Sequence, residues 1–248
     1  MTATIDLKKP LLKRFLLMLL TLITFILLAS IFWLVEEHLR DPHRYPLKVV
    51  KIEGEFKYLT KSDIEYAAAE VSRGGWFSVD LKIIRQAVED IPWVDNASIR
   101  RIWPATLELM IIEQKPYARW GDSGLLNLRA ESYTPRNGII PQDLPYLMGP
   151  VGSEKQVAKR YLEINKKLAV LDLEIKRIEL NQRGAWRLVL NNEIKVELGV
   201  KNIDKRLQRL LTSYPLLKSQ TNAGILIKID CRYPNGLAVL RQALTEIS

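Results

Sequence analysis

The distribution of hydrophobic and polar residues sets one segment apart, because the chain from Phe15 to Val35 is apolar and contains no charged residue. As an α-helix this segment is long enough to cross the hydrocarbon layer of a bilayer, which is about 30 Å thick. A cleaved signal peptide is the alternative, but its apolar region is about 7–15 residues long and ends at a small-residue cleavage site, which Trp33–Glu37 lacks. We therefore predict an uncleaved membrane-spanning helix at 15–35.

Charged residues on the two sides of this span predict its orientation. Four basic residues stand just before it: Lys8, Lys9, Lys13 and Arg14. Acidic residues dilute the positive charge just after it, and a long following domain is translocated largely regardless of its own charge. We expect a cytoplasmic tail at 1–14, a juxtamembrane linker at 36–46 and an exported remainder, with Trp33 at the outer membrane–water interface.

The next part of the chain, 47–116, has the pattern of a small α+β unit. Alternating apolar residues predict a strand that ends near Gly54, and Thr60 and Asp63 have the spacing of a capping box, which predicts a helix from about Lys61 to the glycines after Arg73. A second helix is predicted before Pro92 from three apolar residues on one face: Leu81, Ile84 and Val88. Two alternating runs, 94–103 and 106–114, then predict strands, so the expected order is strand, helix, helix, strand, strand.

The remainder, 117–248, is predicted to be a β-rich domain with two helices. Ser153 and Gln156 have capping-box spacing before a helix with one apolar face, and a second periodic run predicts a helix that ends at Pro215. Three antiparallel strands are expected between these helices, with Asn191-Asn192 as a tight turn. Two further apolar runs flank Pro234-Asn235-Gly236, where the Asn-Gly pair predicts a terminal hairpin. The whole chain is therefore expected to be an α+β protein with an N-terminal transmembrane helix.

Composition adds little to this description. The formal net charge is +9, which is compatible with a nucleic-acid partner. Because the chain is expected to be exported, we predict no nucleic-acid partner and favour a solvated basic surface beside an anionic membrane. The single cysteine, Cys231, excludes an intrachain disulfide, so ordinary hydrophobic cores must stabilise the exported part.

Candidate catalytic and metal-binding patterns are weak. The Gly-Asp-Ser-Gly segment at 121–124 resembles the nucleophile segment of trypsin-like proteases, but the two histidines, His38 and His43, both lie in the predicted linker, so a turn between two short strands is the favoured interpretation. One cysteine and two histidines do not make a structural zinc set, and no glycine-rich phosphate loop is present. We predict a protein that is not an enzyme, with no cofactor, metal or small-molecule substrate.

Aromatic residues and the last strand are the remaining candidates for a binding surface. Five tryptophans are expected to serve mainly in cores, with partner binding as the alternative: Trp76, Trp93, Trp103, Trp120 and Trp186. Arg183, beside a turn near Trp186, is a candidate contact for an acidic partner, although a solvated arginine is the default. The strand from Leu237 to Leu240 carries leucine on both faces, which is unusual for an exposed edge and suits cover by a partner or by a neighbouring helix.

Several motifs in order resemble the FtsQ/DivIB family of bacterial cell division proteins. The run "PWVDNASIRRIWPATLELMIIEQKPYARW" is similar to the POTRA domain of that family, and "LPYLMGPVGS", "WRLVLNNEIKVELG" and "IDCRYPNGLAV" are similar to its distal domain. The resemblance implies a POTRA domain at 47–116, a distal β domain at 117–248, and a place in the bacterial inner membrane at the division septum, with a periplasmic C-terminal part.

The resemblance also implies partners. By this resemblance, the last strand of the chain is expected to bind FtsB, in a complex that also contains FtsL. The POTRA domain is expected to contact earlier division proteins. Septal peptidoglycan synthesis would then be controlled by recruitment of these proteins. The residues implicated by the motif are Tyr233, Asn235, Gly236, Leu237, Ala238, Val239 and Leu240. Two alternatives are a POTRA-containing secretion or envelope transport component and an anchored envelope hydrolase.

Overall fold

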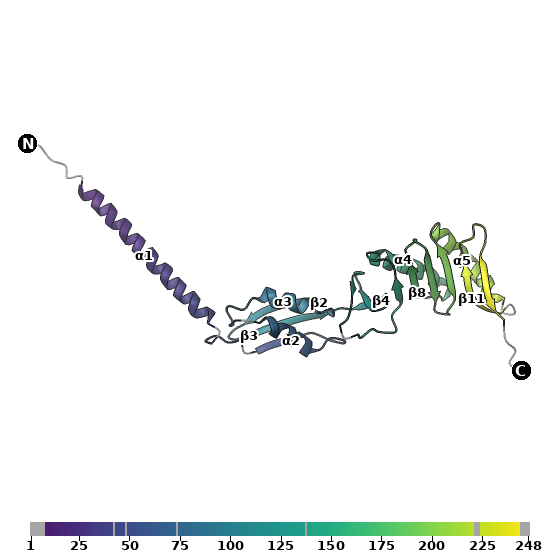
Figure 1. Cartoon of the computed structure of the whole chain (residues 1–248), viewed down its shortest axis with the longest axis horizontal. Coiled ribbons are helices and arrows are strands. Elements are labelled where there is room, and N and C mark those ends of the chain that lie inside the picture. The colour runs from purple at the N-terminus through teal and green to yellow at the C-terminus, as the bar shows by residue number, and fades with distance from the viewer. Residues whose placement is uncertain are drawn as a thin grey trace, which may run out of the picture. The chain divides into compact units, whose positions relative to one another are not determined.

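The computed structural model describes residues 8–41, 43–47, 49–72, 74–136, 138–220 and 224–243. It divides into two compact units, Met1–Glu113 and Gln114–Ser248, whose elements follow one another along the chain in Figure 1. Parts of the predicted cytoplasmic tail, residues 1–7, lie outside the described residues, as do Arg73 and the last five residues of the chain.

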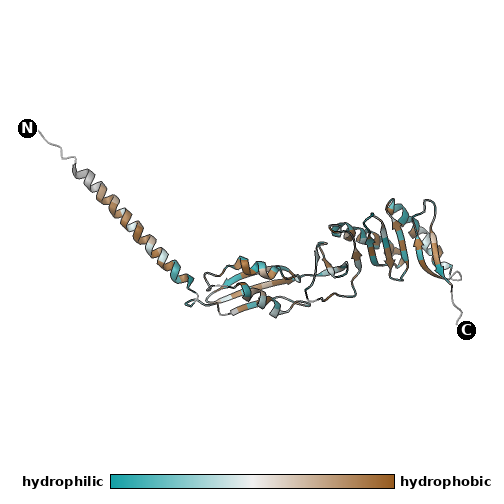
Figure 2. Ribbon diagram, in the orientation of Figure 1, coloured by the Kyte–Doolittle hydropathy of each residue, from teal (hydrophilic) through white to brown (hydrophobic). Residues whose placement is uncertain are grey.

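The first element, α1 (Lys8–Arg40), contains the predicted span. Its side chains from Phe15 to Val35 are exposed, and the ribbon in Figure 2 is mostly coloured as hydrophobic along the middle of this helix. The helix is long and apolar enough to cross a membrane. It continues beyond the predicted span as far as Arg40, which forms an ion pair at 2.5 Å with Glu36, one turn earlier.

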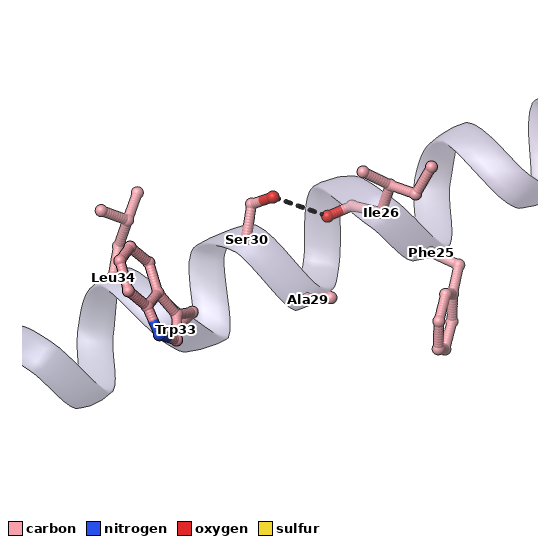
Figure 3. A pocket seen from close by; sticks show the side chains of 6 residues that line it. All are labelled: Phe25, Ile26, Ala29, Ser30, Trp33 and Leu34. Atoms are coloured by element: carbon pink, nitrogen blue, oxygen red, sulfur yellow. Dashed lines mark hydrogen bonds between the residues drawn. The ribbon is translucent and has the colours of Figure 1, made fainter.

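The hydroxyl groups within α1 are satisfied by the helix itself. Figure 3 shows the side chains of Phe25, Ile26, Trp33 and their neighbours projecting from one stretch of the helix, with the Ser30 hydroxyl donating to the Ile26 carbonyl at 2.9 Å. Thr21 and Thr24 donate in the same way to carbonyls one turn earlier. These hydroxyl groups therefore present no unpaired donor to a lipid environment.

The rest of the first unit has the predicted order of elements and forms a POTRA-like unit (residues 49–113). Its elements are β1 (Val49–Glu53), α2 (Lys61–Val71), α3 (Leu81–Glu89), β2 (Val94–Ile102) and β3 (Thr106–Glu113). The sheet has the order β1-β3-β2, with β1 parallel to β3 and β2 antiparallel to β3. The predicted strand-helix-helix-strand-strand order is confirmed.

Local sequence signals explain where the helices of this unit begin. The Thr60 hydroxyl accepts from the backbone N–H of Asp63 and the Asp63 carboxylate accepts from that of Thr60, so the predicted capping box is confirmed. Asp80 caps α3 by accepting from the Lys82 backbone N–H at 2.8 Å. Both helices bury apolar residues, as β3 does; the fully enclosed side chains are Ile64, Ile84, Val88, Leu107 and Leu109.

A carboxylate at the end of β3 fixes the loop that leads into α2. The Glu113 carboxylate accepts from the backbone N–H groups of Lys57, Tyr58 and Leu59, at 2.7, 2.7 and 2.6 Å. Charge-assisted hydrogen bonds of this kind are stronger than neutral ones. The last residue of the unit therefore holds the β1–α2 connection in place.

The second unit is built on one nine-stranded sheet. Its strands are β4 (Pro116–Trp120), β5 (Gly124–Asn127), β6 (Ser132–Tyr133), β7 (Tyr146–Met148), β8 (Ile175–Leu180), β9 (Trp186–Leu190), β10 (Lys195–Gly199), β11 (Ile225–Asp230) and β12 (Ala238–Gln242). They lie in the order β12-β11-β10-β9-β8-β7-β4-β5-β6. The predicted antiparallel series β8, β9, β10 and the turn at Asn191-Asn192 are confirmed.

Two helices pack on this sheet, α4 (Glu154–Leu168), followed by the short 3-10 helix η1 (Ala169–Leu171), and α5 (Ile203–Ser219). The predicted capping box of α4 is wrong, because the Ser153 hydroxyl donates to the Pro150 carbonyl at 2.6 Å and makes no cap bond. The predicted end of α5 at Pro215 is also wrong. The helix continues to Ser219, since Leu217 packs against the core and its carbonyl accepts from Arg241 at 2.6 Å.

Candidate functional site

The candidate site is the edge of the large sheet formed by β12. This strand pairs antiparallel with β11, with Val239 opposite Ile229 and Leu240 opposite Lys228. Among the described residues β12 is the last strand on that side of the sheet, so the backbone groups directed away from β11 have no neighbouring strand. An edge of this kind can pair with an extended segment of another chain.

The connection between β11 and β12 differs from the predicted Asn-Gly turn. It runs from Cys231 to Leu237, and Asp230 pairs with Ala238 across it. Gly236 is not among the residues with positive φ, which a two-residue type I′ turn requires at both central positions. The hairpin is therefore confirmed, but the tight turn is wrong, and Leu237 precedes the strand instead of forming part of it.

Arginine side chains from α5 determine the shape of this loop. The Arg209 guanidinium donates to the carbonyls of Tyr233, Pro234 and Gly236 at 2.7, 2.7 and 3.0 Å. Arg206 donates to the carbonyl of Arg232 at 3.0 Å and to that of Leu198 at 2.7 Å. Because four of these bonds go to carbonyls of the loop, those of Arg232, Tyr233, Pro234 and Gly236, the two arginines stabilise its observed conformation.

The first residues of the loop are held by charge and burial. Arg232 donates to the Asp230 carboxylate at 2.6 and 2.9 Å, and this hydrogen bonding holds the pKa of Asp230 below its ordinary value. Cys231 is fully buried, and burial raises the pKa of its thiol to about 12. The thiol is therefore protonated and enclosed while the loop keeps this conformation.

Beyond the loop, β12 presents apolar side chains to solvent. Val239 is 41% exposed, Leu240 57% and Tyr233, in the loop, 55%. Ala238 and Asn235 are exposed as well, whereas Gly236 is half-buried and Leu237 packs against the domain core. The sequence predicted a leucine on each face of this segment. In the structure Leu237 packs against the core and Leu240 is exposed to solvent.

Arg183 lies in the β8–β9 turn and is exposed. Trp186 pairs with Gly199 at the end of β10, and Glu197 pairs with Asp230 at the end of β11, so this turn and the β11–β12 loop lie at the same end of the sheet. Three strand spacings, about 14 Å, separate β9 from β12. The structure places Arg183 on the same rim as the other candidate residues but not beside β12.

Other candidate groups have structural roles. The Gly-Asp-Ser-Gly segment joins β4 to β5, and Asp122 accepts a hydrogen bond from the Tyr146 hydroxyl at 3.3 Å. Both histidines belong to the first unit, and the described residues contain no group of three or more His, Cys, Asp or Glu that could hold a metal ion. The core role predicted for the tryptophans is confirmed for Trp76, Trp93 and Trp186 and is wrong for Trp103, which is 77% exposed.

These features define a two-domain α+β protein with an N-terminal candidate membrane helix, a POTRA-like unit and a β-rich domain that ends in an edge strand. Comparison with family models agrees with this description: residues 45–114 match "POTRA domain, FtsQ-type" and residues 118–232 match "Cell division protein FtsQ/DivIB, C-terminal". The second match ends at Arg232, before the candidate edge strand.

Curated relatives agree with the family models. A protein of Shewanella oneidensis named "Cell division protein FtsQ" is 35% identical over 84% of this chain and 78% of its own length. Proteins with the same name from Coxiella burnetii and Escherichia coli are each 33% identical, over 81% and 90% of this chain and 82% of their own length. The chain belongs to the FtsQ/DivIB family of cell division proteins, and the resemblance inferred from its motifs is confirmed.

Proposed function

We propose that this protein is a non-catalytic scaffold of the bacterial division machinery that captures FtsB through β12. In this proposal FtsL is held in the same complex, the POTRA-like unit contacts earlier division proteins, and septal peptidoglycan synthesis is controlled by this recruitment. Family membership supports a role in cell division over the alternative of a transport component. The observation that carries the proposed mechanism is the apolar edge strand at the end of the sheet.

The composition of β12 supports addition of a partner strand. Natural proteins protect exposed edges with lysine, proline or bulges on the edge strand, and β12, with the sequence AVLRQ, contains no lysine, proline or acidic residue. Its single charged side chain, Arg241, is directed to the carbonyls of Leu217 and Gly224, at 2.6 and 2.9 Å, and so does not shield the edge. A partner strand would cover both the free backbone groups and Leu240.

The proposal includes a topology and a location. Residues 1–14 form a cytoplasmic tail, residues 15–35 cross the bacterial inner membrane once, 36–46 form a juxtamembrane linker, and the two domains at 47–116 and 117–248 lie in the periplasm at the division septum. The excess of lysine and arginine before the span supports this orientation. Imaging a fluorescent fusion of the full chain tests the location, and a uniform membrane signal in dividing cells would contradict it.

The strand-addition mechanism is tested by proline substitution at two adjacent positions, Val239→Pro and Leu240→Pro. Successive residues of a strand direct their N–H groups to opposite sides, so one variant removes a bond to β11 and the other removes a donor on the free edge. We expect the variant that disrupts only the free edge to fold normally and to lose binding to the extracytoplasmic part of FtsB. Binding is measured by calorimetry, and folding is measured by circular dichroism.

The matched controls are Val239→Ile and Leu240→Ile, which keep the backbone donors and place an apolar β-branched side chain at each position. If the proline variant that remains folded binds FtsB as well as its isoleucine control does, strand addition at β12 is refuted. Arg183→Ala and Tyr233→Ala measure the contribution of the rest of the rim. Because these residues lie outside the strand, each is expected to weaken binding less than the disruptive proline does.

A further inference from the structure

The tip of the POTRA-like unit carries exposed apolar side chains that partner capture at β12 does not use. Trp103, between β2 and β3, is 77% exposed, and its neighbour Ile102 is 37% exposed. Phe77, in the loop between α2 and α3, is 42% exposed. Tryptophan is usually well covered in folded proteins, and an exposed group of large apolar residues marks a surface that contacts a partner or a membrane.

Backbone register places the tip at the end of the small sheet where the chain enters from the membrane helix. Ile102 pairs with Thr106 across the tip, and Thr106 pairs with Val49, the first residue of β1. The Arg101 guanidinium donates to the carbonyls of Trp76 and Val79 at 2.9 and 2.6 Å. These bonds join the end of β2 to the loop that carries Phe77.

The same loop is bonded to the end of α1 and to the linker. The Ser78 hydroxyl donates to the Arg40 carbonyl at 3.3 Å, and the backbone N–H of Trp76 donates to the Tyr45 carbonyl at 2.8 Å. The rings of Tyr45 and Phe77 pack edge to face, with centroids 5.2 Å apart. The tip is therefore connected, through the loop that carries Phe77, to the last turn of the helix.

Helix geometry gives the depth of that last turn. The apolar segment Phe15–Val35 has a length of about 31 Å, which matches a hydrocarbon layer of about 30 Å. Arg40 lies five residues beyond Val35, which is about 8 Å along the axis, and each headgroup layer is about 5–7 Å thick. The end of α1 thus lies at the outer surface of the headgroup layer, with the Phe77 loop bonded to it.

We propose that the tip formed by Ile102 and Trp103, together with Phe77, inserts into the headgroup region of the membrane that α1 crosses. Tryptophan is enriched at membrane–water interfaces because its ring is apolar and its N–H can still reach a polar group. Arg40 and Arg44 lie near this loop but are paired with Glu36 and Asp41, so the apolar side chains are what favour the interface. Because the tip is connected so closely to the end of α1, we infer that it contacts the outer surface of that membrane and not a soluble protein.

The experiment uses the full chain with Cys231→Ala, reconstituted in vesicles of phosphatidylethanolamine and phosphatidylglycerol. An environment-sensitive fluorophore is attached at Ala105→Cys, at the tip, or at Ile112→Cys, an exposed apolar position further along the same hairpin. Quenching by lipids with a nitroxide on the headgroup is then compared. We expect several-fold stronger quenching at 105 than at 112, and a loss of that difference in Trp103→Asp but not in Trp103→Tyr.

Equal quenching at the two positions would overturn the proposal. Strong quenching at 105 that persists in Trp103→Asp would overturn it as well, because the attachment to α1 alone would then account for the proximity. Protection of the label only after a soluble division protein is added would assign the tip to a protein partner instead. Circular dichroism of each variant checks that the exposed substitutions leave the fold intact.

Discussion

Removing the Arg209 guanidinium is expected to release the loop that leads into the edge strand. Arg209→Met keeps an unbranched apolar stem but deletes the donors to the carbonyls of Tyr233, Pro234 and Gly236. If each bond contributes about 1 kcal/mol, the value of an ordinary bond and below the range for charged groups because Arg209 is only half-buried, the loss is about 3 kcal/mol. The population of the opened loop should then rise about 100-fold.

Cys231, the first residue of the loop, reports on this opening. Its thiol is fully buried in the closed state, and a thiol reagent reacts with it only through the fraction of molecules that have opened locally. The assay is the rate of labelling of the full chain under native conditions, with the rate in denaturant as the reference. We expect faster labelling of Arg209→Met, approaching the factor calculated for opening.

Arg160→Met is the matched control in the same domain. Arg160 forms ion pairs with Glu163 and Asp204 on the surface of α4 and α5, at 3.2 and 3.5 Å, and makes no bond to the loop. Its loss should leave the labelling rate unchanged. If Arg209→Met folds normally and is labelled at the rate of the unmodified protein, Arg209 does not restrain the loop and the reasoning is refuted.

Two further perturbations test the POTRA-like unit and the loop. Glu113→Ala should lower the free energy of unfolding, measured by chemical denaturation, by about 2–3 kcal/mol, because it removes a charged acceptor from three backbone donors. Glu55 is exposed in the β1–α2 connection, and Glu55→Ala, the control, should have little effect in the same measurement. Since bonding to Arg232 lowers the pKa of Asp230, the stabilisation by this pair is complete above the ordinary value of 3.8 and is lost as the pH falls through the lower folded value. Asp230→Asn should therefore reduce the loss of thermal stability on acidification, and an unchanged pH profile would contradict the pairing.

Elements set by neighbouring residues could be predicted from the sequence. The start of α2 depends on Thr60 and Asp63, which are three residues apart, so its capping box could be predicted from the sequence alone. The end of α5 was not, because a proline signals only the loss of one local bond, while the packing of Leu217 and the bond from Arg241 come from residues that are distant in sequence. Strand β7 has only three residues, too few for alternation to be detected.

The candidate edge was predictable as a hairpin, but not in its detail. Asn235-Gly236 favours a two-residue turn when only local preference counts, and the carbonyl bonds to Arg209 select a longer loop instead. The exposure of Trp103 also escaped prediction, because in the sequence it continues the run of β2, whereas in the structure it lies in the turn beyond the last paired residues of β2 and β3. For the loop, the deciding contacts join segments that are far apart in the sequence.

The arginine contacts have a consequence for binding at β12. A partner segment that adds to a sheet edge loses conformational entropy when it binds, which lowers the affinity. If the strand that receives it were also disordered before binding, the affinity would be lower still. Arg206 and Arg209 hold the loop before β12, and Arg241 joins the strand itself to the end of α5, so the proposed mechanism would need little further ordering of this edge. A protein that presents an exposed apolar edge accepts a risk of non-specific pairing, and a rigid loop at its start limits the register in which another strand can pair.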